Sequence, residues 1–207
     1  MTIEKGKPWG RPRAELAGPP PGTAASDAAA RAVVERARRA NEPVPPVVLL
    51  GGDLARTVGG GADPAHAAGV DAMALPCDIA SVLLDGRQHW FVAHLVARRS
   101  WWHGRVYAAM NAQFVGRWDV APRSHPNDGR LDVVDVAPAM RRRDRLAARR
   151  RLPTGTHVPH PAVRTERTAA AQVTFDPPLR VWLDGVDVGE VRNVSLRVEP
   201  DALTVIV

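Results

Sequence analysis

The sequence is poor in several features that would narrow its class at once. It contains a single cysteine, Cys77, among 207 residues, which excludes an internal disulfide framework and a cysteine-rich zinc site. No apolar run approaches the roughly 18 residues of a membrane-spanning helix. Residues 1–7 also lack the apolar stretch of a secretory signal. We therefore expect a protein of the reducing cytoplasm.

Lysine is scarce as well, and arginine takes its place. Only Lys5 and Lys7 are lysines among the 28 basic residues, and the net charge is +6. Such an excess attracts phosphates and anionic surfaces without naming the partner, and we expect no nucleic acid. Hydrophobic residues make up 45% and charged residues 24% of the chain, ordinary values for a folded protein of one large or two small domains.

The first third of the chain divides into an arm and a short α/β segment. Glycine and proline are frequent in residues 1–23, which predicts a flexible arm. Ser26 is a suitable N-cap for a helix that ends near Asn41. The apolar run 47–50 is followed by two glycines, which predicts a buried strand leading into a turn. Residues 24–66 therefore form the α/β segment.

From residue 67 onward the pattern changes to β-structure. Asp85-Gly86 separates two apolar segments, 79–84 and 89–96, and such a pair predicts a tight hairpin. One helix is expected over residues 140–152. Further strands are expected at residues 105–115, 131–136, 163–168, 171–175, 181–183, 188–191, 194–198 and 203–207. Short strands at regular spacing favour a β-sandwich over residues 67–207.

Two aspartates occupy positions at which a carboxylate could bind a metal ion or act as a general base. Asp53 follows Gly51 and Gly52, and glycines let backbone N–H groups approach phosphate oxygens while a carboxylate at a helix start can reach Mg²⁺. Asp128 precedes Gly129 between two expected strands, where a carboxylate can act as a general base. The alternative in each case is an ordinary turn, capped by its aspartate, and local spacing alone favours that alternative.

Four segments, taken in chain order, resemble a known family. They are residues 52–56 (GDLAR), 111–134 (which contains APRSHPNDGRLDVV), 181–185 (VWLDG) and 196–207 (LRVEPDALTVIV). Together they resemble the bacterial diacylglycerol kinases and YegS-like lipid kinases, relatives of sphingosine and ceramide kinases. The resemblance implies a β-rich α+β fold, in which an NAD-kinase-like β-sandwich follows a shortened α/β segment. It also implies transfer of the γ-phosphate of ATP, with Mg²⁺, to a lipid hydroxyl.

The resemblance also implies roles for individual residues. The family's general base falls on Asp128, its magnesium-linked carboxylate on Asp53 beside Gly51 and Gly52, and its late nucleotide-side pair on Asp184 and Gly185. Its glutamate after that pair is replaced by Val186. The family's phosphate-binding GGDGT loop does not occur in the sequence.

Three hypotheses therefore stand at this point. The first is an ATP- and Mg²⁺-dependent lipid kinase. The second is a catalytically inactive relative that binds a lipid, a nucleotide or a protein. The third is a nucleotide site completed by another subunit of a homo-oligomer. The missing loop favours the second hypothesis, because phosphoryl transfer depends on positioning and charge stabilisation, whereas the retained aspartates favour the first.

An arginine-rich stretch is a separate feature. Seven arginines lie within residues 141–151, and each basic residue near an anionic lipid surface contributes ~1 kcal/mol. Membrane contact through Arg141, Arg142, Arg145 and Arg149 is one interpretation, and a solvated helix face is the other. The neighbouring pair Trp101-Trp102 is compatible with an interfacial anchor or with a core corner.

Overall fold

The computed structural model describes residues 9–16, 21–60, 65, 69 and 71–207. Its helices are α1 (Asp27–Ala40), α2 (Asp53–Thr57) and α4 (Arg142–Arg151), with 3₁₀ turns at Arg13–Glu15 and Leu152–Thr154. Its strands are β1 (Arg11–Pro12), β2 (Gly22–Ala24), β3 (Val47–Leu49), β4 (Met73–Leu84), β5 (Arg87–Phe91), β6 (His94–Arg98), β7 (Val106–Met110), β8 (Phe114–Val115), β9 (Trp118–Asp119), β10 (Leu131–Val136), β11 (Val163–Thr168), β12 (Ala170–Leu183) and β13 (Val186–Ile206). Among the described helices, none has the length and apolar character needed to cross a membrane.

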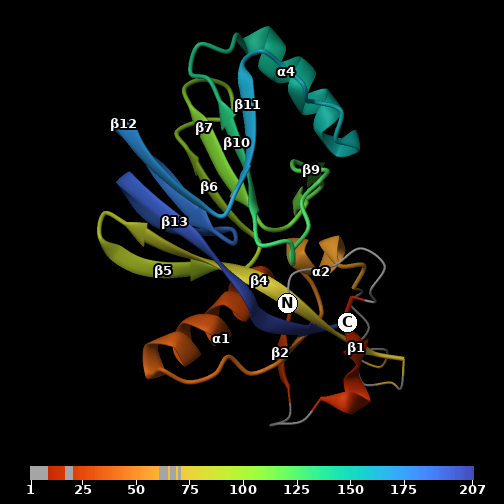
Figure 1. Cartoon of the computed structure of the whole chain (residues 1–207). Helices are drawn as coiled ribbons and strands as arrows, with labels where there is room; N and C mark the ends of the chain where they lie inside the picture. The colour runs from red at the N-terminus through yellow and green to blue at the C-terminus, as the bar shows by residue number, and fades with distance from the viewer. Residues whose placement is uncertain (1–8, 17–20, 61–64, 66–68, 70) are drawn as a thin grey trace.

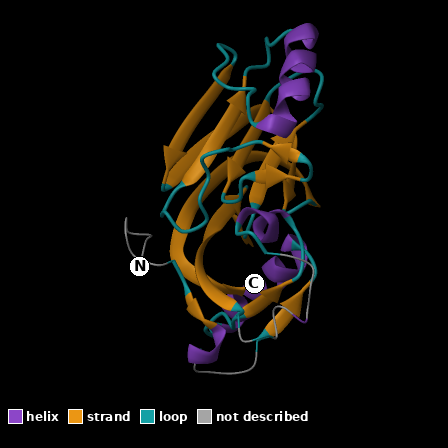
Figure 2. Cartoon of the chain, turned by 90° about the vertical axis from the view of Figure 1, so that its right-hand side faces the viewer, coloured by secondary structure: helices purple, strands orange, loops and turns teal. Residues whose placement is uncertain are grey.

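Most strands join one strongly curved sheet. Its order is β1-β4-β13-β12-β6-β7-β10-β11, with β5 added beside β4, and these neighbours are all antiparallel. The long strands β4 and β13 pair with each other and run from the sandwich into the α/β segment, where β13 meets β3 (Figure 1). Seen from the side, the sheet curls so that its halves face each other, and α4 lies at the end far from the α/β segment (Figure 2).

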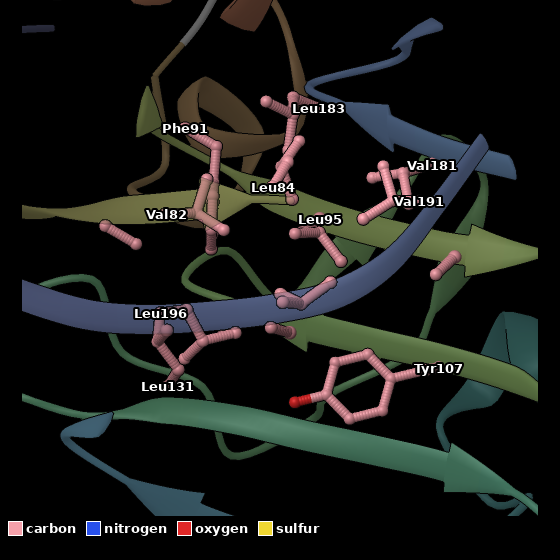
Figure 3. Packing of buried hydrophobic residues seen from close by; sticks show 14 of the residues in the cluster. Val82, Leu84, Phe91, Leu95, Tyr107, Leu131, Val181, Leu183, Val191 and Leu196 are labelled. Atoms are coloured by element: carbon pink, nitrogen blue, oxygen red, sulfur yellow. The ribbon is translucent and has the colours of Figure 1, made fainter. Parts of the chain in front are cut away.

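The main core lies between the two halves of the sheet. Alternate side chains of each strand point inward, as the two-residue period of a strand requires. Figure 3 shows this packing, with Phe91, Leu95, Leu131 and Leu196 meeting from four different strands. Burial of each such side chain contributes about 2 kcal/mol. The β-rich sandwich predicted from strand spacing is therefore the architecture observed.

The α/β segment is built onto one end of the same sheet. Ser26 caps α1 by accepting a hydrogen bond from the Ala29 N–H at 3.2 Å, and Asn41 ends the helix in the left-handed conformation. β2 pairs in parallel with β3, and β3 pairs in parallel with the last residues of β13. The C-terminal end of β13 therefore supplies the third parallel strand of this segment.

Two local predictions are corrected by the structure. The flexible arm predicted for residues 1–23 is wrong for the strand residues within it, because Arg11 of β1 pairs with Ala74 at the edge of β4 and β2 pairs with β3. The hairpin at Asp85-Gly86 is confirmed, with Leu84 opposite Arg87. The single strand predicted over residues 89–96 is instead two strands, separated at residues 92–93.

Candidate functional site

Four ionisable residues meet where the α/β segment joins the sandwich. Asp27 opens α1, Asp53 opens α2, His94 opens β6, and Asp184 lies in the turn between β12 and β13. One potential ligand atom from each of Asp27, Asp53 and His94 lies within 4.8 Å of the other two. Three chain segments that are far apart in sequence thus place carboxylates around one imidazole.

Asp27 caps the start of α2. Its carboxylate accepts hydrogen bonds from the N–H groups of Asp53 at 2.6 Å and Leu54 at 3.1 Å. Gly52 has a φ of +106°, and a Cβ at this position would collide with the Asp27 carboxylate. A Cβ at Gly51 would lie 2.8 Å from the Ala25 carbonyl oxygen. These glycines therefore allow α1 and α2 to approach closely. The N–H groups at the start of α2, where a phosphate could bind, are instead bonded to Asp27.

Asp53 joins three elements. Its Oδ2 atom lies 2.9 Å from His94 Nε2, and its two carboxylate oxygens share the Gly116 N–H at 2.9 and 3.0 Å. Arg56, one turn further along α2, donates to the Gly116 carbonyl at 2.7 Å and stacks over Phe114. The Asp53 side chain keeps 17% of its surface exposed, so it is the part of this cluster that solvent can reach.

Asp184 stabilises the short irregular segment between β5 and β6. Its carboxylate accepts hydrogen bonds from the N–H groups of Val92, Ala93 and His94 at 2.8–3.0 Å. Its own N–H donates to the His94 carbonyl at 2.9 Å. Gly185, with a φ of +81°, completes the turn. The Asp-Gly pair singled out in the sequence therefore positions the backbone that carries His94.

Burial and pairing shift the proton affinities of the cluster. Burial raises the pKa of Asp184 to about 6, although His94 and the three backbone N–H groups favour its charged form. Burial alone would lower the pKa of His94, but the hydrogen bond to Asp53 and the charge of Asp184 raise it above its ordinary value. Burial also raises the pKa of Asp27. Asp27, His94 and Asp184 therefore all keep a proton to higher pH than free side chains of their types.

Asp128 belongs to a different cluster. It forms an ion pair with Arg167 of β11, and its Oδ1 atom accepts the Arg130 N–H at 3.0 Å. Buried Asp78 of β4 lies beside it and accepts the N–H groups of Gly129 at 2.7 Å and Asp201 at 3.0 Å. Burial raises the pKa of Asp78 to about 6.

A buried asparagine connects the two clusters. The Asn111 amide donates to the carbonyls of Val92 at 2.7 Å and Asp78 at 2.8 Å. The structure thus places Asp53 and Asp184 in one cluster and Asp128 in the other, with Asn111 between the two clusters. Sequence reasoning missed Asp27 and His94, which stand inside predicted elements, and Asp78, which directly precedes one; none of the three carries a local signal of a catalytic or binding role.

An apolar cavity of about 100 Å³ lies beneath α4. One wall is the outer face of the sheet, another is the inner side of α4, and a third is formed by tryptophans 101, 102 and 118. Trp101 and Trp118 pack edge to face with ring centroids 5.2 Å apart. His157 also lines the cavity, and burial lowers its pKa, so its imidazole is neutral at pH 7. Hydrocarbon is the chemistry that such a lining suits.

Arg145 does not belong with the exposed arginines. It is 5% exposed, and its guanidinium donates to the carbonyls of Trp101, Ala137, Met140 and Gly104. Its inclusion among membrane-contacting residues is therefore wrong. Arg145 instead fastens α4 to the loops that close the cavity, while Arg149 stacks over Trp102 and Trp118 at 5.0 and 5.7 Å.

A curled antiparallel sheet with a short α/β segment at one end is the architecture of the NAD-kinase-like β-sandwich. Residues 80–207 match the YegS C-terminal NAD kinase beta sandwich-like domain. Because this match covers more than half of the sequence, the chain belongs to that family of YegS-like lipid kinases. The predicted family and fold class are confirmed.

Solved structures show the same fold. A protein described as a candidate diacylglycerol kinase from Bacillus anthracis str. Sterne is 12% identical and superposes with a TM-score of 0.60, over 78% of this chain and 69% of that one. Another diacylglycerol kinase structure from the same organism, also 12% identical, gives a TM-score of 0.53 over 78% of this chain and 66% of that one. Among curated proteins, none matches the sequence.

Proposed function

We propose that the protein binds a lipid, with hydrocarbon in the cavity beneath α4. The observation that carries this proposal is the lining of that cavity, which is almost wholly aliphatic and aromatic. Each methylene group moved from water into such a site contributes about 0.8 kcal/mol. Lipid binding is also what membership of a lipid kinase family requires of one of its sites.

The size of the cavity limits how much of a lipid it can hold. At about 100 Å³ it accommodates a short piece of hydrocarbon, so a longer chain requires α4 to move outward. α4 is attached on its inner side by Arg145 and by the stacking of Arg149 on two tryptophans. His157 offers a hydrogen-bonding group to a hydroxyl or ester, and the only other polar side chains of the described lining are Arg145 and Arg149.

Two neighbouring alanines of α4 provide the test. Ala148 lines the cavity, whereas Ala147 is exposed on the other side of the helix. Dioctanoylglycerol, below the concentration at which it aggregates, is titrated into each variant by tryptophan fluorescence. Ala148→Phe should weaken binding at least tenfold, and Ala147→Phe should change it less than twofold.

Equal affinities in the two variants, or no binding by the wild-type chain, would overturn the proposal. Ala108→Leu fills the cavity from β7 and should reproduce the loss. This second variant keeps the test decisive if Ala148→Phe disturbs α4, which circular dichroism would reveal.

The second candidate function is phosphoryl transfer from ATP to a lipid hydroxyl. The gathering of Asp53, Asp184 and His94 favours it, because a carboxylate that solvent can reach and that is hydrogen-bonded to an imidazole is useful for proton transfer. In this reaction the lipid hydroxyl oxygen attacks the γ-phosphorus, its proton passes to a carboxylate, and ADP leaves. Asp53 and Asp128 are the two candidates for that carboxylate.

The Asp53 carboxylate also suits Mg²⁺. Its hydrogen bonds leave one lone pair of Oδ1 unused, since each carboxylate oxygen can accept two. Mg²⁺ in kinase sites is bound by one or two carboxylates together with substrate phosphates, and Asp53 with Asp27 would supply them. A bound Mg²⁺ would offset the charge of the ATP phosphates. His94 would orient Asp53 through the bond to Oδ2.

Transfer of labelled γ-phosphate to dioctanoylglycerol tests this candidate. Asp53→Asn should abolish transfer while leaving lipid binding intact, and Asp128→Asn tests the alternative base. Transfer that is absent from the wild-type chain, or that survives both substitutions, would contradict the kinase candidate and leave the lipid-binding proposal standing on its own titration.

A further inference from the structure

The outer face of α4 combines exposed arginines with exposed apolar surface. At 100° per residue, Arg143, Leu146, Ala147 and Arg150 lie on one side of the helix, and all four are exposed. The opposite side carries Arg145, Ala148, Arg149 and Leu152, which line the cavity. The helix therefore has one face for the protein and one for solvent.

The exposed arginines of α4, on the outer face and at its two edges, have few partners within the protein. Arg143 approaches Asp144 at 3.6 Å, with 75% of its own side chain exposed. Within the described residues, the structure records no ion pair for Arg142, Arg150 or Arg151. Their charge is thus available to an external anion.

Large apolar side chains stand among these charges. Leu146 is 41% exposed and Trp102 is 39% exposed, which makes them two of the four exposed large hydrophobic residues described. Trp102 lies beside α4, because Arg149 stacks on its ring and Arg145 donates to the carbonyl of the preceding residue. An isolated exposed leucine needs no explanation, but here Leu146 stands among exposed arginines, and the partly exposed Trp102 lies at the side of the same helix.

We infer that the outer face of α4, with Trp102 beside it, docks on an anionic lipid membrane. A helix with arginines around an apolar centre lies in the plane of a membrane interface, where its cations meet anionic headgroups and its apolar side chains enter the acyl boundary. Charge complementarity selects this occupant over a neutral protein surface. The purpose of docking rests on the proposed lipid binding, because it sets α4, one wall of the cavity, against the lipid supply.

Vesicle binding of charge-reversal variants tests the inference. Sedimentation is measured with phosphatidylcholine vesicles that contain or lack 30% phosphatidylglycerol. The pair Arg143→Glu and Arg150→Glu should weaken binding to anionic vesicles at least tenfold. The matched control pair, Arg36→Glu and Arg87→Glu, changes the net charge equally at exposed positions of α1 and β5, and should change binding less than threefold.

Insertion is followed at a single labelled site. Cys77 is fully buried, so Leu146→Cys can be labelled selectively with an environment-sensitive dye. Its emission should shift to the blue on anionic vesicles, whereas Ala32→Cys on the outside of α1 should show no shift. Equal loss in both charge-reversed pairs, equal shifts at both labels, or binding to duplex DNA in place of vesicles would overturn the inference.

The cavity-filling variant separates docking from lipid binding. Ala148→Phe should keep full affinity for anionic vesicles while it loses dioctanoylglycerol. Vesicle binding lost in this variant would contradict docking by the outer face. Retained vesicle binding with retained dioctanoylglycerol binding would contradict the cavity proposal alone.

Discussion

At the junction of the α/β segment with the sandwich, charged side chains are bonded to the protein itself, whereas on the outer face of α4 they point into solvent. Asp27 and Asp184 together accept five backbone N–H groups. Arg142 and Arg150 make no ion pair within the described residues. The contrast teaches that these charges differ in what they contact. The arginines that follow one another along α4 are free to bind a partner, whereas the junction carboxylates, which only the fold brings together, bond to the backbone and stabilise it.

Loss of Asp184 should have the largest effect on stability. Asp184→Ala leaves three buried N–H groups without an acceptor, and we expect a loss of about 3 kcal/mol in the free energy of unfolding. Urea denaturation measures the change. Asp176→Ala is the control, because that side chain is 81% exposed. Similar losses in the two variants would show that Asp184 does not organise the junction.

The second-largest loss of stability is expected on substitution of Arg145, the arginine of α4 whose guanidinium donates hydrogen bonds to backbone carbonyls. Arg145→Met removes donors to four carbonyls, and a loss of about 2 kcal/mol is expected. Hydrogen exchange should also accelerate in α4 more than in α1. The exposed Arg142→Met is the matched substitution, and faster exchange in that variant as well would speak against a special role of Arg145.

Stability should fall as pH rises across the neutral range. The folded-state pKa of Asp184 is raised to about 6 and that of His94 is raised above its ordinary value, so these two groups bind more protons in the folded state than in the unfolded state. Stability is therefore greatest below the unfolded pKa of each group and declines through the folded one. Between pH 5 and pH 8 we expect a decrease on the order of 1 kcal/mol. A thermal midpoint that rises over this interval would contradict the assigned shifts.

The smallest expected effect concerns the outer face of α4. Leu146→Ala and Arg150→Ala alter exposed side chains, so each should change the free energy of unfolding by less than about 0.5 kcal/mol. Differential scanning calorimetry checks this expectation. A larger loss would mean that this face supports the fold and is not free to bind a membrane.

Local features were predictable where a short segment determines its own structure. The Ser26 cap, the Asn41 end of α1 and the Asp85-Gly86 hairpin follow from backbone chemistry within a few residues. The family was predictable too, because its motifs occur in order along the chain.

The junction cluster was not predictable, because its parts are distant in sequence. Asp53 takes its partner His94 from 41 residues away, and Asp184 reaches back 90 residues to the same strand. Only the folded sheet brings these segments together. The break in the strand predicted over residues 89–96 has the same cause, since the carboxylate that stabilises it lies in another hairpin.

One titration distinguishes the α4 cavity from the junction cluster as the lipid-binding site. Dioctanoylglycerol is titrated into three proteins: the wild-type chain, Ala148→Phe and Asp53→Asn. Our account predicts that Ala148→Phe loses at least tenfold in affinity and that Asp53→Asn binds as tightly as the wild type. Loss of binding in Asp53→Asn, with full binding in Ala148→Phe, would place the lipid at the junction and contradict the assignment of the α4 cavity.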